Sequence, residues 1–124
     1  MDAPRFVWNE LVSADPGKSR DFYASLFGWE TEPFGTDGKY LLFKKGEAKL
    51  GGLIACPQPD SPSHWLPYVA VDDLDAALAQ ATSLSAAVIL PPMEIPTVGR
   101  IAIVTDPLGA PLGLGQFLPC PAGE

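Results

Sequence analysis

The chain has 124 residues, of which 47% are hydrophobic, and a formal net charge of −7. This length and composition predict one domain with a packed core, residues 1–124, and exclude a disordered chain. The acidic balance argues against nucleic acid or an anionic membrane as a partner, and no apolar run reaches the ~18 residues that a membrane span needs. Because no basic and apolar signal segment is visible, we expect a cytoplasmic protein.

The first half predicts a strand, a helix and three more strands. A strand-forming run at residues 6–12 is followed by Asp15 and Pro16, a pair typical of a helix start. Apolar side chains then recur at helical spacing up to Gly28, where we expect the helix to end. The predicted buried face of this helix consists of Ser19, Phe22, Tyr23, Leu26 and Phe27. The three further strands are predicted at residues 29–34, 40–45 and 49–56.

A proline-rich connector is predicted at residues 57–64, and the second half then repeats the order of the first. A strand at residues 66–71 precedes a helix that Asp72 or Asp73 caps. The predicted buried face of this helix consists of Leu74, Ala77, Leu78 and Ala81. The remaining strands are predicted at residues 87–90, ending at Pro91 and Pro92, and at residues 98–105 and 110–117.

The two halves align without a gap when the chain is shifted by 58 residues. Asp15 then falls on Asp73, and Gly51 falls on Gly109. This punctuation predicts one supersecondary unit built twice, with copies at about residues 5–56 and 65–118. Since such a unit buries its apolar face poorly alone, we expect the copies to share a core or a cleft.

Two stretches resemble a known superfamily: WNELVSADPGKSRDFYASLFGWE at residues 8–30 and GRIAIVTDPLGAPLGL at residues 99–114. The resemblance is to the vicinal oxygen chelate superfamily, which contains glyoxalase I, extradiol dioxygenases and the bleomycin- and fosfomycin-resistance proteins. It covers about residues 5–118. It implies an α+β fold of two tandem βαβββ modules, whose curled sheets face each other around a cleft, and it implies a homodimer.

Enzymes of this superfamily usually hold a divalent metal with His, Glu or Gln side chains on the first and last strand of each module. By the resemblance, these places fall on Trp8, Ala55, Leu66 and Gly113. None of these side chains binds a metal ion. Moving two residues along a strand adds only Glu10 and His64 as ligands, so we expect no metal and no other cofactor.

Alternation along the strands predicts the lining of a small-molecule pocket: Trp8, Glu10 and Tyr68. Glu10 is interpreted as a base, as an anchor for a cationic group, or as a structural partner of Arg100. His64 is either a solvated loop residue or an acid–base group, and Tyr68 and Trp8 either stack on a ligand or pack in the core. The candidate catalytic residues are Glu10, His64 and Tyr68.

The sequence therefore predicts a glyoxalase-like protein that binds a small molecule without the usual metal site. Three alternatives stay open: a metal-independent isomerase, lyase or hydroxylase-like enzyme, a drug-sequestering resistance protein, and an interaction module. Cys56 and Cys120 have no metal-binding spacing and are predicted to be reduced thiols.

Overall fold

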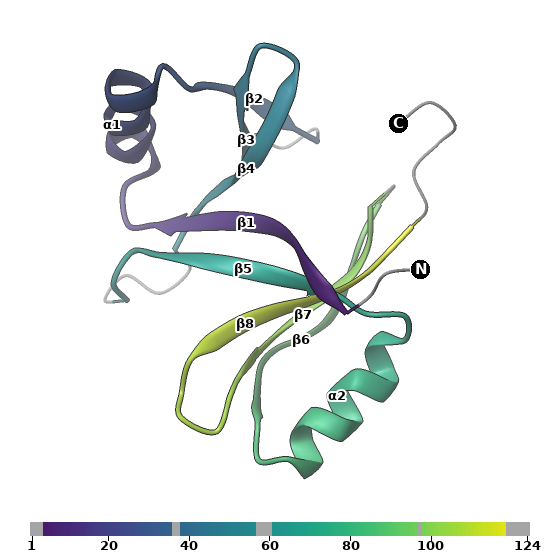
Figure 1. Ribbon diagram of the computed structural model, residues 1–124. Coiled ribbons are helices and arrows are strands. Elements are labelled where there is room, and N and C mark those ends of the chain that lie inside the picture. Colours follow the sequence, from purple (N-terminus) through teal and green to yellow (C-terminus); the bar gives the residue numbers. More distant parts are fainter. Residues whose placement is uncertain (1–3, 36–37, 57–60, 97, 119–124) are drawn as a thin grey trace. The chain divides into compact units, whose positions relative to one another are not determined.

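The computed structural model describes residues 4–35, 38–56, 61–96 and 98–118. The first module contains β1 (Arg5–Ser13), α1 (Pro16–Phe27), β2 (Glu30–Phe34), β3 (Tyr40–Lys45) and β4 (Ala48–Ala55). The second module contains β5 (His64–Ala70), α2 (Leu74–Ser83), β6 (Ala87–Ile95), β7 (Gly99–Thr105) and β8 (Pro111–Phe117) (Figure 1). The predicted α+β class and the two βαβββ modules are confirmed.

Within each module the first strand pairs in parallel with the last, and the remaining neighbours are antiparallel. The strand order is β2-β3-β4-β1 in the first module and β5-β8-β7-β6 in the second. The chain divides into two compact units: the first unit, residues 8–66, and the second unit, residues 1–7 and 67–124. The single domain over residues 1–124 stays a prediction, and residues 57–60 of the predicted connector lie outside the described residues.

Helix α1 begins and ends where the sequence predicts. The Asp15 side chain accepts a hydrogen bond from the Lys18 backbone N–H at 3.1 Å, and Pro16 occupies the first turn. Gly28 adopts a left-handed conformation with φ 74°, which a residue with a Cβ rarely does, and its N–H bonds the Ala24 carbonyl at 2.9 Å. Both helix signals are therefore confirmed.

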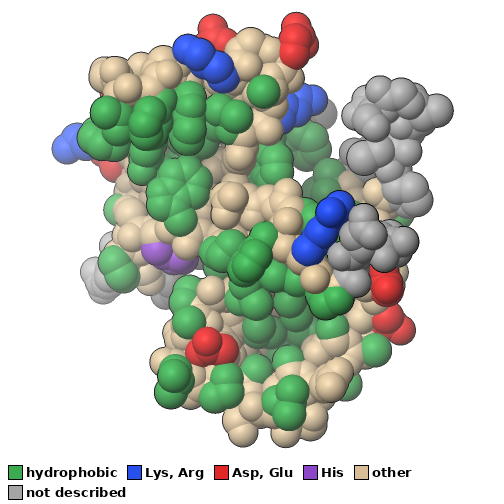
Figure 2. Space-filling view, in the orientation of Figure 1, with side chains coloured by type: hydrophobic (Ala, Val, Ile, Leu, Met, Phe, Trp, Pro, Cys, Tyr) green, Lys and Arg blue, Asp and Glu red, His purple; other side chains and the backbone are tan. Residues whose placement is uncertain are grey.

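The buried face predicted for α1 is only half correct. Tyr23 packs against the core of the first unit, formed by Leu11, Phe43 and Leu53. The Ser19 hydroxyl lies 2.7 Å from that of Ser13 at the end of β1. The other three predicted side chains are about half exposed: Phe22 at 57%, Leu26 at 56% and Phe27 at 50%. Apolar side chains accordingly reach the surface at the upper left of Figure 2, where Figure 1 shows α1.

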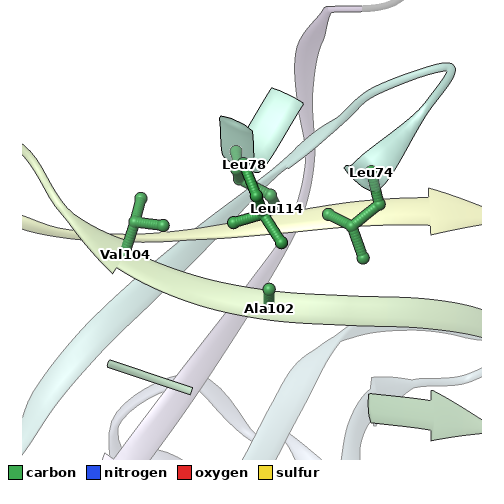
Figure 3. Close-up of a cluster of buried hydrophobic side chains, with 5 residues drawn as sticks. All are labelled: Leu74, Leu78, Ala102, Val104 and Leu114. Atoms are coloured by element: carbon green, nitrogen blue, oxygen red, sulfur yellow. The ribbon is translucent and has the colours of Figure 1, made fainter. Parts of the chain in front are cut away.

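The core of the second unit forms between α2 and strands β7 and β8. Asp73 caps α2 by accepting a hydrogen bond from the Ala76 backbone N–H at 3.1 Å. The buried cluster contains two side chains from α2, two from β7 and one from β8: Leu74, Leu78, Ala102, Val104 and Leu114 (Figure 3). Ala77 packs against this cluster, so the face predicted for α2 is confirmed at Leu74, Ala77 and Leu78.

Two predicted strand boundaries are wrong. Strand β6 does not end at Pro91 and Pro92 but continues to Ile95, with register shifts between Val88 and Met93. Because β6 is an edge strand, the missing proline N–H groups leave no ladder partner unsatisfied. Strand β5 begins at His64, so this residue belongs to a strand and not to the predicted connector.

The repeat also contains an insertion that an ungapped alignment misses. Position 10 pairs with Gly52, and position 68, which is 58 residues further on, pairs with Gly113. The second module therefore has three more residues between its paired strands, and part of the difference is the longer, irregular β6. The structural counterpart of Gly113 is Gly52, so the assignment of that place to Ala55 is wrong.

Neither described helix, of 12 and 10 residues, has the length and apolar character needed to cross a membrane.

Candidate functional site

Strand β1 directs its side chains alternately to two chemically different faces of the first unit. Leu11 points toward α1 and belongs to the core with Phe43 and Leu53. Its neighbour Glu10 therefore lies on the other face, where it pairs across the sheet with Gly52 of β4. Glu10 is only 5% exposed, although it is a charged residue on a sheet face. A buried carboxylate needs hydrogen-bond partners to offset its lost hydration.

The partner of Glu10 is Tyr40, at the start of β3. The phenol oxygen of Tyr40 accepts a hydrogen bond from the Trp8 indole Nε1 at 2.9 Å. The same hydroxyl is hydrogen-bonded to Glu10, and since an ionised carboxylate only accepts, the phenol is the donor. Trp8, Tyr40 and Glu10 thus form a chain of hydrogen bonds from indole to phenol to carboxylate.

The electrostatic environment keeps the Tyr40 phenol protonated. Burial raises the pKa of Tyr40 well above its ordinary value, and the nearby Glu10 charge raises it further. The hydrogen bond to Glu10 acts in the same direction, whereas the bond from Trp8 lowers the pKa. The phenol therefore stays a neutral donor to the carboxylate at physiological pH.

A glycine makes room for this arrangement. Gly52 lies between Glu10 and Leu42 in the sheet, and a Cβ at this position would overlap the hydroxyl and ring of Tyr40. Gly113 has the same relation to the ring of Tyr68 in the second unit. The interpretation of these strand glycines as points of close approach is confirmed at both positions.

The other predicted site residues have different surroundings. Tyr68 is 3% exposed, lies in the second unit and packs over Gly113, so a cavity shared with Trp8 and Glu10 stays a prediction. The imidazole Nδ1 of His64 lies 3.0 Å from the Pro62 carbonyl oxygen, and because a carbonyl only accepts, Nδ1 has the proton. His64 lines an open groove with Lys18 and Ser63, and Glu10 is not part of that lining.

Arg100 is not the partner of Glu10. Its guanidinium forms two hydrogen bonds with the Asp75 carboxylate, at 3.1 and 3.2 Å, and this pairing raises the pKa of Arg100 while lowering that of Asp75. Both side chains are substantially exposed, so the pair adds little to stability. The alternative that Arg100 neutralises Glu10 is wrong, and the alternative that Arg100 has a structural ion pair is confirmed.

The first and last strands do not present the donor set of a metal site. Among the described residues, no three His, Cys, Asp or Glu side chains cluster closely enough to hold an ion. Gly52 and Gly113 occupy matching places on β4 and β8, and each is covered by a tyrosine ring where a metal-binding side chain would have to project. The divalent metal that the resemblance implies does not fit these residues.

Tyr40 is the residue that sequence reasoning missed. Its position follows only from the register of β1, β4 and β3, which brings residues 10, 52 and 42 side by side. The paired glycines Gly51 and Gly52 are the signal that could have found it, because a glycine inside a strand often marks a bulky neighbour.

Comparisons with known proteins give the family. The model of the Glyoxalase/Bleomycin resistance protein/Dioxygenase superfamily matches residues 5–114. The chain belongs to this superfamily. A proposed glyoxylase, CFP32 of Mycobacterium bovis, is 39% identical over 84% of this glyoxalase-family chain, and the match covers 41% of CFP32. The anthracycline biosynthesis protein DnrV of Streptomyces peucetius is 33% identical over 84% of the chain and 44% of its own length.

The chain thus spans less than half the length of these relatives. Among solved structures, methylmalonyl-CoA epimerase from Mycobacterium tuberculosis superposes with a TM-score of 0.62 at 16% identity, covering 92% of this chain and 88% of the epimerase. At this level of identity the likeness shows a common fold and not a common activity.

Replacing Tyr40 with Phe tests the hydrogen-bond chain through its pH dependence. At pH 7 the variant leaves buried Glu10 without this donor, so the free energy of unfolding should fall by ~1–3 kcal/mol. The raised pKa means that the stabilisation by Tyr40 is fully present below the pKa of unfolded tyrosine, about 10, and is lost as pH rises above it. The difference between wild type and Y40F should therefore narrow by at most ~1.4 kcal/mol per pH unit above pH ~10.

Urea unfolding of both proteins between pH 7 and 11 measures this difference. Tyr23→Phe is the matched control, because its hydroxyl accepts only an exposed bond of 3.3 Å from Trp65 on the helix side. A difference that stays constant over the whole pH range would contradict the assigned environment of Tyr40.

Proposed function

We propose that this protein binds a small organic molecule, with a positive charge or N–H and O–H donors, at the face of the first unit that contains Trp8, Tyr40 and Glu10. The observation that supports this is the carboxylate of Glu10, which is 5% exposed and hydrogen-bonded to a phenol that stays protonated. A carboxylate accepts about four hydrogen bonds, and Tyr40 uses only part of this capacity.

The chemistry of this face favours a donor ligand. The negative charge of Glu10 attracts cations and N–H or O–H donors, and the net charge of −7 raises the local concentration of cations. The Trp8 ring, which is partly buried, supplies an apolar wall whose indole N–H is already engaged by Tyr40. An apolar wall beside a fixed polar group is typical of small-molecule sites.

A metal-independent enzyme remains the second candidate. The same carboxylate could act as a general base, because Tyr40 holds it in place without donating a full charge to it. A drug-sequestering role differs only in lacking turnover. Conversion of the bound molecule by wild-type protein, lost in Glu10→Gln with binding retained, would favour the enzyme.

Glu10→Gln tests the anchor. The change keeps the shape of the side chain and removes its charge, so affinity for a cationic or donor-rich ligand found by thermal-shift screening should fall by ~1–3 kcal/mol. Glu32→Gln is the matched control, since Glu32 pairs across the sheet with Leu42 on the same face but forms an ion pair with Lys44 at 3.0 Å. Equal losses of affinity in both variants, or none in Glu10→Gln, would rule out the anchor.

The absence of a metal cofactor is a second prediction. Because Gly52 and Gly113 offer no donor at the last-strand places, protein dialysed against metal-free buffer should contain far less than one divalent ion per chain by elemental analysis. Addition of zinc, nickel, iron or manganese should leave the melting temperature unchanged, since an ion that binds the native state would raise it. About one tightly held ion per chain would refute this prediction.

We propose a second copy of the chain as the protein partner. The outer face of α1 exposes Phe22, Leu26 and Phe27, a concentration of large apolar side chains that suits an interface. Relatives more than twice as long fit this proposal, because a longer chain can supply the covering surface from its own sequence.

Light scattering after size exclusion measures the oligomeric state. Wild-type protein should be a dimer at micromolar concentration, and Leu26→Glu should shift it toward monomer, because a charge would have to be buried in the interface. Leu84→Glu is the matched control at a similarly exposed leucine, 64% against 56%, and should leave the dimer intact. A monomeric wild-type protein at every concentration would end this proposal.

A further inference from the structure

A cavity of about 230 Å³ opens on the helix-covered face of the first unit. Its lining consists of Asn9, Trp29, Phe43, Leu50, Gly51 and Trp65. Asn9 precedes Glu10 on β1, so alternation directs the two side chains to opposite faces of the sheet. This cavity is therefore separate from the face that contains Glu10. We propose that it is a second binding site, for a small neutral aromatic compound.

The aromatic rings around the cavity are held by their neighbours. Phe43 is fully buried, and its ring centroid lies 5.3 Å from that of Trp29 and 6.2 Å from that of Trp65. Trp29 also stacks on Tyr23, with centroids 5.6 Å apart. Trp65 is 40% exposed and contacts the Tyr23 ring edge-on. Two fixed rings and one exposed indole form a wall that an aromatic ligand would complete, burying Trp65.

The lining selects against charge. Among the described residues that line the cavity, none has a charged side chain, and Asn9 supplies the one polar side chain. An ionic ligand would lose its hydration here without gaining a partner of opposite charge. The Asn9 amide can donate and accept, so it suits a neutral molecule with a hydroxyl or ring N–H.

The volume limits the size of the ligand. A water molecule occupies about 30 Å³ in the liquid, and sites for drug-sized ligands begin near ~300 Å³. A cavity of about 230 Å³ therefore suits a compound with one or two rings. Gly51 leaves this space open: a Cβ there would lie 2.6 Å from the Asn9 carbonyl oxygen and 4.0 Å from the Trp65 ring.

The three tryptophans make a direct test with phenol as the probe, because Trp8 lies on the face opposite to Trp29 and Trp65. In protein labelled with 5-fluorotryptophan, the three ¹⁹F signals are assigned with single Trp→Phe variants. Titration with phenol should shift the Trp29 and Trp65 signals saturably and together, and should leave Trp8 unchanged. Cyclohexanol and benzyltrimethylammonium are the comparison probes, one lacking the aromatic ring and the other adding a charge.

Two variants check the site without depending on each other. Leu50→Phe fills the cavity and should abolish the phenol shifts, whereas Leu108→Phe, at a side chain 96% exposed in the second unit, should not. Asn9→Ala removes the amide and should weaken phenol binding roughly 3- to 10-fold. The absence of saturable shifts at Trp29 and Trp65, or equal binding of cyclohexanol, would overturn the proposal. Tighter binding of the ammonium probe would overturn the choice of a neutral ligand.

The two sites can fail separately. Glu10→Gln should leave phenol binding at Trp29 and Trp65 unchanged, because Glu10 does not line this cavity. Loss of the phenol shifts in Leu50→Phe with unaltered binding at the Glu10 face would support two sites. A single ligand that shifts all three tryptophan signals in parallel would contradict them.

Discussion

The parallel pairing between the first and last strand of each module is the constraint on which the structure depends. Parallel neighbours need a long crossover, and here a helix and two antiparallel strands supply it. In both modules a glycine of the last strand meets the first strand at this pairing, Gly52 beside Glu10 and Gly113 beside Tyr68. The space above Gly52 admits the Tyr40 ring, and this packing brings a phenol to the buried carboxylate. The candidate site is thus a consequence of strand register.

Much of the fold was predictable because short-range signals fix it. Asp15, Pro16 and Gly28 satisfy the ends of α1 through interactions within a few residues, and Asp73 does the same for α2. The errors have long-range causes. Whether Pro91 and Pro92 end a strand depends on β6 lying at an edge, and the exposure of Phe22, Leu26 and Phe27 depends on how little of α1 the sheet covers. Apolar spacing predicts a helix but not which apolar residues find a partner.

The candidate site was predicted in part for the same reason. Alternation along one strand correctly separates Glu10 from Leu11, because this rule needs no knowledge of the neighbouring strands. Tyr40 is 30 residues away in sequence from Glu10, and only the register of three strands brings them together. The three-residue insertion in the second module had a similar effect: matching helix caps hid it, and the place carried back from Gly113 fell on Ala55 and not on Gly52.

Membership of the superfamily limits the function less than the residues do. The fold supplies a sheet with one face covered by a helix and the other free to receive polar side chains, and many chemistries use such a scaffold. In this chain, glycines beneath tyrosine rings occupy the last-strand places where the superfamily usually has metal ligands. Neighbouring residues of β1 then face two environments, a carboxylate bonded to a phenol and an amide beside aromatic rings. Because a one-residue slip of β1 would exchange these faces, the register that builds the core also keeps the two environments apart.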